Sequence, residues 1–193
     1  MDICTRCEKN EKYYFEMYCK ECEAKLHRNR KVARNRKRKA VEKRLQGLQD
    51  RTIKAGLPYC LTVDDFLQLH KDFDHKCAIT ESERLLTVDH FIPLSIGHGG
   101  TYLGNIFPLN FDFNEWKDTE NPFEWKRSLK RLKYRQRFNQ LVDYLARQNE
   151  LTRSDFVDYV YWCFNNPRSK AFIAADGEVS SIELWKKSGK GRG

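Results

Sequence analysis

A block of positive charge at residues 25–44 limits what this chain can fold into. The block holds eleven Lys or Arg residues and one acid, Glu42, whereas the rest of the 193-residue chain holds 25 bases and 26 acids. Only Val32 and Ala33 are apolar within residues 27–39, so a helix here has no stripe that could pack on its own domain. The residue types still favour a helix. We therefore expect a solvated basic helix, or one that a polyanion orders.

Two Cys-x-x-Cys pairs precede the basic block and predict a metal site. Cys4 and Cys7 form the first pair, and Cys19 and Cys22 form the second after eleven intervening residues. Zinc prefers four tetrahedral ligands, and each pair presents two thiolates to one ion. Because so short a segment cannot bury a core of its own, we expect a structural Zn²⁺ ion to stabilise it. The alternatives are four unrelated thiols or an iron–sulfur cluster. Residues 13–15 are expected to form a small strand over this site.

The chain has no sequence feature of a membrane or secreted protein. No apolar run reaches the ~18 residues that a membrane span requires. The N-terminus lacks the apolar region of a secretory signal. We therefore expect no membrane partner and a cytoplasmic location. The cytoplasm is a reducing compartment, in which close-spaced cysteines bind metal more often than they form disulfides.

Three helices are predicted beyond residue 55. Thr62 and Asp65 have the spacing of a capping box at the start of the first. Pro122 suits the first position of the second, whose apolar stripe is Trp125, Leu129, Leu132, Phe138, Leu141 and Leu145. Thr152 caps the third, which we expect to form a helical hairpin with the second. Residues 186–193 are predicted to be a frayed tail.

Between these helices, about thirty residues follow the order strand, loop, strand, helix. Residues 85–92 are rich in strand-forming types and stop at Pro93. Residues 97–100 are a glycine-rich loop, residues 105–109 form a second short strand, and residues 110–117 can begin a helix.

Four polar residues on these elements suit metal-dependent hydrolysis of phosphodiester bonds. Asp89 and His90 end the first strand, Asn105 starts the second, and Asn114 lies on the helix. A carboxylate and an amide oxygen are the hard ligands that a divalent ion requires. A neighbouring imidazole can take the proton of the attacking water. Because Asp89 and His90 alternate along a strand, a twist or bulge would be needed to aim both at one substrate.

The run from Leu86 to Ser95 closely resembles the HNH, or ββα-metal, endonuclease family, together with Gly99–Gly100, Asn105, Pro108–Leu109, Asn114 and Lys117. The resemblance covers residues 75–118. It implies an α+β fold, with a ββα-metal core, surrounding helices, an N-terminal zinc knuckle and a long basic helix. It also implies that Asp89 and Asn114 bind a catalytic Mg²⁺ or Mn²⁺, that His90 is the general base, and that Asn105 holds the loop that orients His90.

One departure from the family concerns a second zinc site. Many members clamp this motif with a zinc ion between two Cys-x-x-Cys pairs. The corresponding segments here are Cys77–Thr80 and Asn110–Phe113, which lack three of the four ligands, so we expect no zinc there. Apolar packing by Phe111, Phe113 and Trp116, with the helical hairpin, is expected to replace the clamp.

These features together predict a metal-dependent HNH endonuclease that acts on double-stranded DNA. The expected domains are a Cys4 zinc knuckle, a basic DNA-binding helix, the nuclease core, and a helical extension with a tail, at residues 1–24, 25–55, 56–118 and 119–193. Phosphate contacts give affinity without reading sequence. The side chains expected to contact DNA are Arg28, Arg30, Lys31, Arg34, Arg36, Lys37, Arg38 and Lys39.

The biological role has several alternatives. The chain looks like a phage-borne homing or restriction-like nicking enzyme, which would act in the cytoplasm of the host cell. A phage packaging nuclease is the nearest alternative. A non-catalytic zinc protein that binds DNA or regulates it, and a protein that acts on RNA, are the alternatives from other classes.

Overall fold

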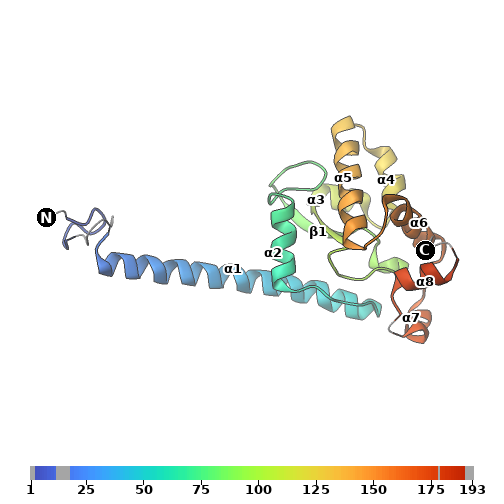
Figure 1. Ribbon diagram of the computed structural model, residues 1–193, viewed down its shortest axis with the longest axis horizontal. Helices are drawn as coiled ribbons and strands as arrows, with labels where there is room; N and C mark the ends of the chain where they lie inside the picture. The colour runs from blue at the N-terminus through green and yellow to red at the C-terminus, as the bar shows by residue number, and fades with distance from the viewer. Residues whose placement is uncertain (1–2, 12–17, 178, 190–193) are drawn as a thin grey trace. The chain divides into compact units, whose positions relative to one another are not determined.

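The structure, a computed structural model, describes residues 3–11, 18–177 and 179–189. The chain divides into two compact units, Met1–Arg44 and Leu45–Gly193. The fold is mixed α and β and mostly helical, with one two-stranded sheet in the part that the structure describes (Figure 1). Within the same part, no helix is long and apolar enough to cross a membrane. The strand expected at residues 13–15 lies outside the described residues.

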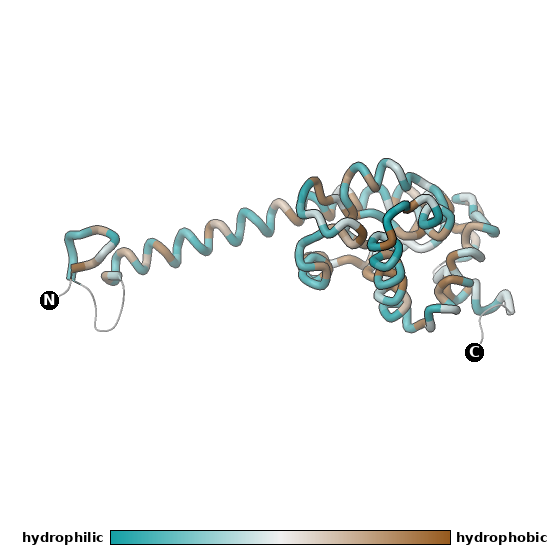
Figure 2. The backbone as a smooth tube through the Cα atoms, turned by 90° about the horizontal axis from the view of Figure 1, so that it is seen from above, coloured by the Kyte–Doolittle hydropathy of each residue, from teal (hydrophilic) through white to brown (hydrophobic). Residues whose placement is uncertain are grey.

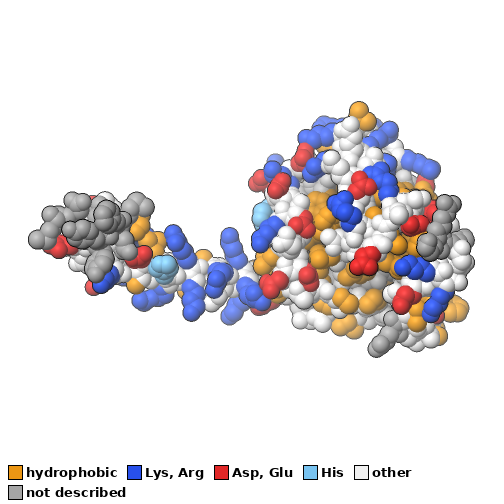
Figure 3. Space-filling model, viewed as in Figure 1, with side chains coloured by type: hydrophobic (Ala, Val, Ile, Leu, Met, Phe, Trp, Pro, Cys, Tyr) orange, Lys and Arg blue, Asp and Glu red, His pale blue; other side chains and the backbone are white. Residues whose placement is uncertain are grey.

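The predicted basic helix is confirmed as α1, Lys20–Ala55, which begins before the basic block and includes Cys22. Every side chain at residues 27–40 is exposed. Hydrophilic residues recur along this stretch (Figure 2), and Lys and Arg side chains follow it closely (Figure 3). Arg38 pairs with Glu42 one turn later at 3.4 Å, a contact that contributes a few tenths of a kcal/mol in such helices. This part of α1 therefore has no buried face.

The last turns of α1 belong to the second unit and have a different character. Leu45, Leu48 and Thr52 are buried and, at spacings of three and four residues, lie on one side of the helix. The helix ends at Ala55, where Gly56 has a φ of 77° and lets the chain reverse. Packing on the second unit therefore stabilises this end.

The predicted order of strand, loop, strand and helix is present. Strand β1, Leu86–His90, pairs antiparallel with β2, Ile106–Asn110, so that His90 lies opposite Ile106. A short 3₁₀ helix, Leu94–Ile96, lies between them. Helix α3, Phe111–Lys117, follows β2 directly, because the Asn110 side chain caps it by accepting from the Asp112 N–H at 3.0 Å.

Helices surround this sheet, and one prediction about them is wrong. Helix α2, Val63–Asp72, has the expected capping box. The single helix predicted from Pro122 is two, α4, Pro122–Ser128, and α5, Leu132–Gln148. The chain leaves the helix at Leu129, whose carbonyl accepts from the Arg135 guanidinium at 2.6 Å. Leu132, placed on the apolar stripe by its spacing, is 70% exposed for this reason.

The C-terminal part is more ordered than the sequence suggested. Helix α6, Arg153–Asn165, forms the expected hairpin with α5. Two further helices follow, α7, Lys170–Asp176, and α8, Ser181–Lys187. The prediction of a frayed tail is wrong for Lys186 and Lys187, because a capping box at Ser180 starts α8 and Trp185 is buried.

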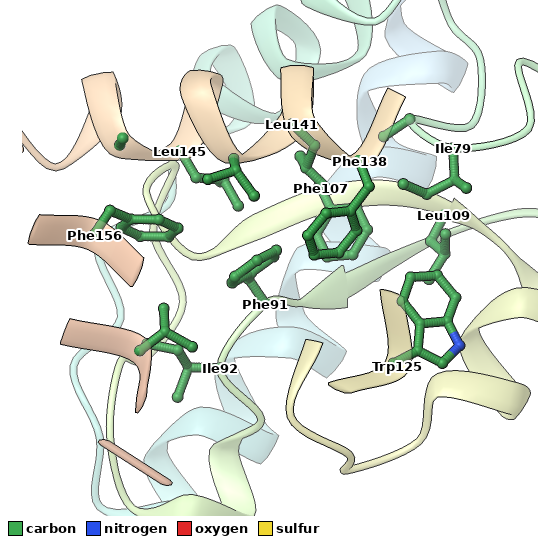
Figure 4. Packing of buried hydrophobic residues seen from close by; sticks show 14 of the residues in the cluster. Ile79, Phe91, Ile92, Phe107, Leu109, Trp125, Phe138, Leu141, Leu145 and Phe156 are labelled. Carbon is green, nitrogen blue, oxygen red and sulfur yellow. The ribbon is translucent and has the colours of Figure 1, made fainter. Parts of the chain in front are cut away.

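The core of the second unit is aromatic and centred on Phe91, the residue after His90 (Figure 4). Its ring lies 5.5–6.1 Å from the rings of Phe107, Phe123, Phe138 and Phe156. Edge-to-face and tilted pairs at these distances add to the free energy of burial. The core thus anchors the chain at the residue directly after Asp89 and His90.

The apolar packing predicted for Phe111, Phe113 and Trp116 is only partly present. Phe113 packs against Trp125 and Tyr134, and half-exposed Trp116 contacts both Phe113 and Trp125. Phe111 is 46% exposed, so its expected role is wrong. The two segments are joined instead through Cys77, whose buried Sγ accepts from the Asn110 N–H at 3.3 Å.

Candidate functional site

The four N-terminal cysteines form a cluster that can bind a metal such as zinc. The Sγ atoms of Cys4, Cys7, Cys19 and Cys22 all lie within 4.8 Å of one another. A tetrahedral zinc site with bonds of about 2.3 Å places its sulfurs roughly 3.8 Å apart. The Sγ atoms of Cys7 and Cys19 are 3.8 Å apart. The geometry of the predicted ligand set therefore fits the ion.

The surroundings of the cluster shift the pKa values of Cys4 and Cys22 in opposite directions. The Cys19 N–H donates to Cys4 Sγ at 3.3 Å and lowers the pKa of Cys4 to about 6. The Asn10 side-chain amide donates to Cys19 Sγ at 3.7 Å and to the Glu21 carboxylate at 3.1 Å. Burial and the neighbouring sulfurs raise the pKa of Cys22 to about 12. Four thiols this close ionise together only if a cation joins them.

In the second unit, Asp89, His90 and Asn114 come together on one open pocket of about 560 Å³. His90 is the last residue of β1, so the chain leaves the sheet there and the alternation along the strand does not separate it from Asp89. The other residues that line the pocket are Arg51, Val88, Pro93, Leu94, Ser95, Glu115, Asp118 and Thr119.

Asp89 is held from both sides. Its Oδ1 accepts from the His90 N–H at 2.8 Å, and its Oδ2 forms an ion pair with Lys117 Nζ at 2.8 Å. Lys117 is fully buried and also donates to the His90 carbonyl at 3.0 Å. Burial raises the pKa of Asp89, and the ammonium group opposes that shift. The carboxylate is therefore fixed in place, and its charge is balanced within the chain.

His90 is neutral at pH 7. Burial, with the charges of Arg51 and Lys117, lowers the pKa of His90 to about 3. Its Nε2 lies 2.7 Å from Thr101 Oγ1. A neutral imidazole that bonds through one nitrogen has a lone pair or an N–H on the other, so it can exchange a proton with a group in the pocket.

Asn114 presents its oxygen rather than its nitrogen. Its Nδ2 donates to Thr87 Oγ1 at 3.1 Å, and Thr87 in turn donates to the Leu109 carbonyl at 2.9 Å. The donor end of the amide is thus bound to β1, which leaves Oδ1 as the end that can serve a ligand.

Asn105 does not line the pocket but holds the chain that surrounds it. Its Oδ1 accepts from the Ile92 N–H at 2.8 Å, and its Nδ2 donates to the carbonyls of Ile92 at 3.0 Å and Gly100 at 2.8 Å. Gly99 has a φ of 74°, and a Cβ there would lie 2.6 Å from Asn105 Nδ2. Only glycine fits at this position, and Asn105 joins the end of β1 to this loop.

The eight side chains expected to contact DNA all lie on α1 in the first unit, and all are exposed. Because every side chain at residues 27–40 is exposed, these eight positive groups form a continuous basic surface. Glu42 is the one acid of the basic block.

Sequence reasoning missed three residues near the pocket. Arg51 lines it from the last turns of α1, and Thr52 and Thr101 join His90 to that helix. Thr52 and Thr101 are 49 residues apart, so no local pattern brings them together. Only the burial of these two threonines beside a polar partner could have identified them, and burial cannot be read directly from a sequence.

Comparisons with known proteins do not supply a function. No family model matches the chain, and no curated protein or solved structure is significantly similar to it. Any assignment therefore depends on the residues and geometry of the two sites themselves.

Proposed function

We propose that the protein is an HNH endonuclease of the ββα-metal type, which hydrolyses phosphodiester bonds in double-stranded DNA with a divalent metal ion. The observation that carries the proposal is the convergence of Asp89, His90 and Asn114 on one pocket, from the end of β1 and from α3. A carboxylate, an amide oxygen and a neutral imidazole in one open pocket are the groups that this reaction requires.

Asp89 and Asn114 fit Mg²⁺ or Mn²⁺. Both offer hard oxygen atoms, and the carboxylate oxygens keep lone pairs beyond the bonds that they already accept. Glu115 and Asp118 line the same pocket and add negative charge. The ion, when bound, would polarise the scissile phosphate and stabilise the leaving oxygen.

The chain's own groups would perform the other steps. His90 takes the proton of the attacking water, and the phosphate anion beside it would raise the low pKa of the imidazole toward the useful range. Arg51 lines the pocket and is placed to bind a phosphate oxygen. Lys117 pairs with Asp89 and opposes the rise in its pKa that burial causes, and Asn105 holds the loop behind His90.

The first unit would supply affinity for DNA. Residues 27–40 of the basic helix have no buried side chain that packing could stabilise, so phosphate contacts are the interaction that the composition of this stretch favours. Zn²⁺ on the four cysteines would fix the segment that precedes it. A single Asp89–His90–Asn114 site within the described residues suits a nick, as in a phage-borne homing or restriction-like enzyme, with a packaging nuclease as the nearest alternative role.

Nicking of supercoiled plasmid DNA in Mg²⁺ or Mn²⁺ tests the proposal. We expect His90→Ala to reduce the rate by about 10²–10⁴-fold, the usual contribution of a positioned base. His75→Ala is a matched control, because this exposed histidine lies outside the pocket and its loss should leave the rate unchanged. Wild-type protein that does not cut, or His90→Ala that cuts at the wild-type rate, would contradict the proposal and favour a non-catalytic DNA-binding protein.

A further inference from the structure

A line of three buried contacts connects His90 to helix α1. His90 Nε2 lies 2.7 Å from Thr101 Oγ1, and Thr101 Oγ1 lies 2.6 Å from Thr52 Oγ1. Thr52 Oγ1 in turn lies 2.7 Å from the carbonyl oxygen of Leu48, one turn earlier in α1. Both threonines are fully buried, so water does not compete for these contacts.

The last acceptor in this line gives it a direction. A carbonyl oxygen only accepts, and each hydroxyl has one proton to donate. If Thr52 donates to Leu48, then Thr101 donates to Thr52, and Thr101 can only accept from His90. In the opposite direction Thr52 donates to Thr101 and Thr101 donates to His90 Nε2, which leaves the contact with Leu48 without a proton. The first arrangement makes three hydrogen bonds and the second makes two, so the first is favoured.

We propose that Thr101 and Thr52 are positioning residues that keep the proton of His90 on Nε2. The lone pair is then on Nδ1, which is the remaining nitrogen for accepting the proton of the attacking water. The part of this inference that concerns water rests on the proposed nuclease function. The location of the proton follows from the contacts alone.

The inference gives the end of α1 a role in the chemistry. Thr52 follows Arg51, which lines the pocket, and both belong to the turns of α1 that lie in the second unit. The two threonine hydroxyls thus form a relay that connects α1 to the end of β1 and determines which nitrogen of His90 carries the proton. Burial of Leu48 and Thr52 on the same helical face keeps the relay aligned.

The nitrogen spectrum of the histidine ring tests the location of the proton in the full-length chain. With ¹⁵N-labelled histidine at pH 7, and with His90→Ala to assign the signal, we expect His90 to show a protonated Nε2. Thr52→Val conserves the shape but removes the acceptor of the Thr101 proton. Thr101 then donates to Nε2, and the proton of His90 moves to Nδ1. Thr52→Ser and Thr101→Ser should keep the wild-type pattern, whereas Thr101→Val should give a mixture.

Single-turnover cleavage at saturating DNA tests the consequence. We expect Thr52→Val to cut about ten-fold more slowly, the effect of one lost hydrogen bond, and Thr52→Ser to restore the rate. DNA affinity should stay constant across the series.

The two readouts separate the two proposals. A wild-type His90 with its proton on Nδ1, or the same pattern in wild type, Thr52→Val and Thr101→Val, overturns the relay. A shifted pattern with unchanged cleavage overturns its role in positioning the base. Absence of cleavage by the wild-type protein contradicts the nuclease function, while the spectra still decide where the proton lies.

Discussion

The two units of this chain are stabilised by different chemistry. The described part of the first unit has a small buried cluster of cysteines and a basic helix whose side chains are exposed. The second buries a continuous core of aromatic and aliphatic side chains. Helix α1 belongs to both and changes character accordingly, from a fully exposed stretch to turns with buried Leu45 and Leu48. The comparison teaches that one helix can be stabilised by packing at one end while the side chains of its basic stretch pack against nothing in the described chain.

Removal of the metal should have the largest effect and should separate the units. Structural zinc contributes on the order of 10 kcal/mol to small domains that cannot bury a core. We therefore expect a strong chelator, or Cys19→Ser, to unfold the segment before α1 and to leave the second unit folded. Metal analysis measures the zinc content of the chain, and amide spectra measure whether each unit stays folded.

Cys60→Ser is the matched control for this experiment, because Cys60 is an exposed cysteine of the second unit. It should change neither metal content nor spectra. Two tightly bound zinc ions per chain would show that a second zinc site exists and would contradict the difference between the units.

The next largest effect concerns DNA affinity. Deletion of residues 1–44 removes the first unit and keeps Arg51 and Thr52. Each phosphate contact contributes about −0.9 to the slope of log affinity against log salt, so the loss of four contacts should flatten that slope by three to four units. Binding across a salt series measures the slope, and single-turnover cleavage should change far less.

A deletion of residues 1–55 is the informative contrast to this variant. It also removes the buried end of α1, with the relay to His90 and the arginine of the pocket. We expect it to lose cleavage as well as affinity. Equal cleavage by the two deletions would show that the end of α1 is not part of the active site.

The aromatic core should give a smaller effect, confined to the second unit. Phe91→Ala removes a ring in contact with four others and should lower the free energy of unfolding by about 3–5 kcal/mol. Phe172→Ala, at a site that is 66% exposed, should change it by less than about 0.5 kcal/mol. Denaturant unfolding measures both, and an equal loss would contradict the proposed centre of the core.

The smallest effect should come from a surface ion pair between α5 and α6. Arg153 lowers the pKa of Asp143, but both groups are well exposed, so Asp143→Asn should cost only about 0.5 kcal/mol. Because the folded-state pKa is depressed, this contribution is present above the ordinary Asp pKa and is lost as the pH falls through the lowered value. The free energy of unfolding of the wild type and of Asp143→Asn, measured at pH 7 and pH 2, checks this. If the variant is still less stable than the wild type at pH 2, the loss comes from packing and not from the ion pair.

Local signals in the sequence predicted much of the fold. The spacing of Thr62 and Asp65 located a helix start, because residues three positions apart make the contact. The two cysteine pairs located a cluster, because each pair brings two thiols close together in sequence. The order of strands and helix around Asp89, His90 and Asn114 also followed from short patterns. These elements bring Asp89, His90 and Asn114 to one pocket.

Long-range contacts account for most of what the sequence did not reveal. The burial of Trp185 depends on the core of the second unit, to which distant parts of the chain contribute. Phe111 begins α3 but faces solvent, which its residue type does not indicate. Thr101 and Thr52 meet only in the folded chain, so their relation to His90 required the structure.

The ion pair between Lys117 and Asp89 has a practical consequence for how this protein would be stored and activated. Because a buried ammonium already balances the carboxylate, the second unit can assemble without a divalent cation. Under the proposed function, magnesium depletion would leave an inactive but intact pocket that regains activity when the ion is added. Loss of a metal from the four cysteines would have no such safeguard, because so small a segment has no other core. The two proposed metals would therefore differ in kind, one needed for the reaction and the other for the shape of a whole segment.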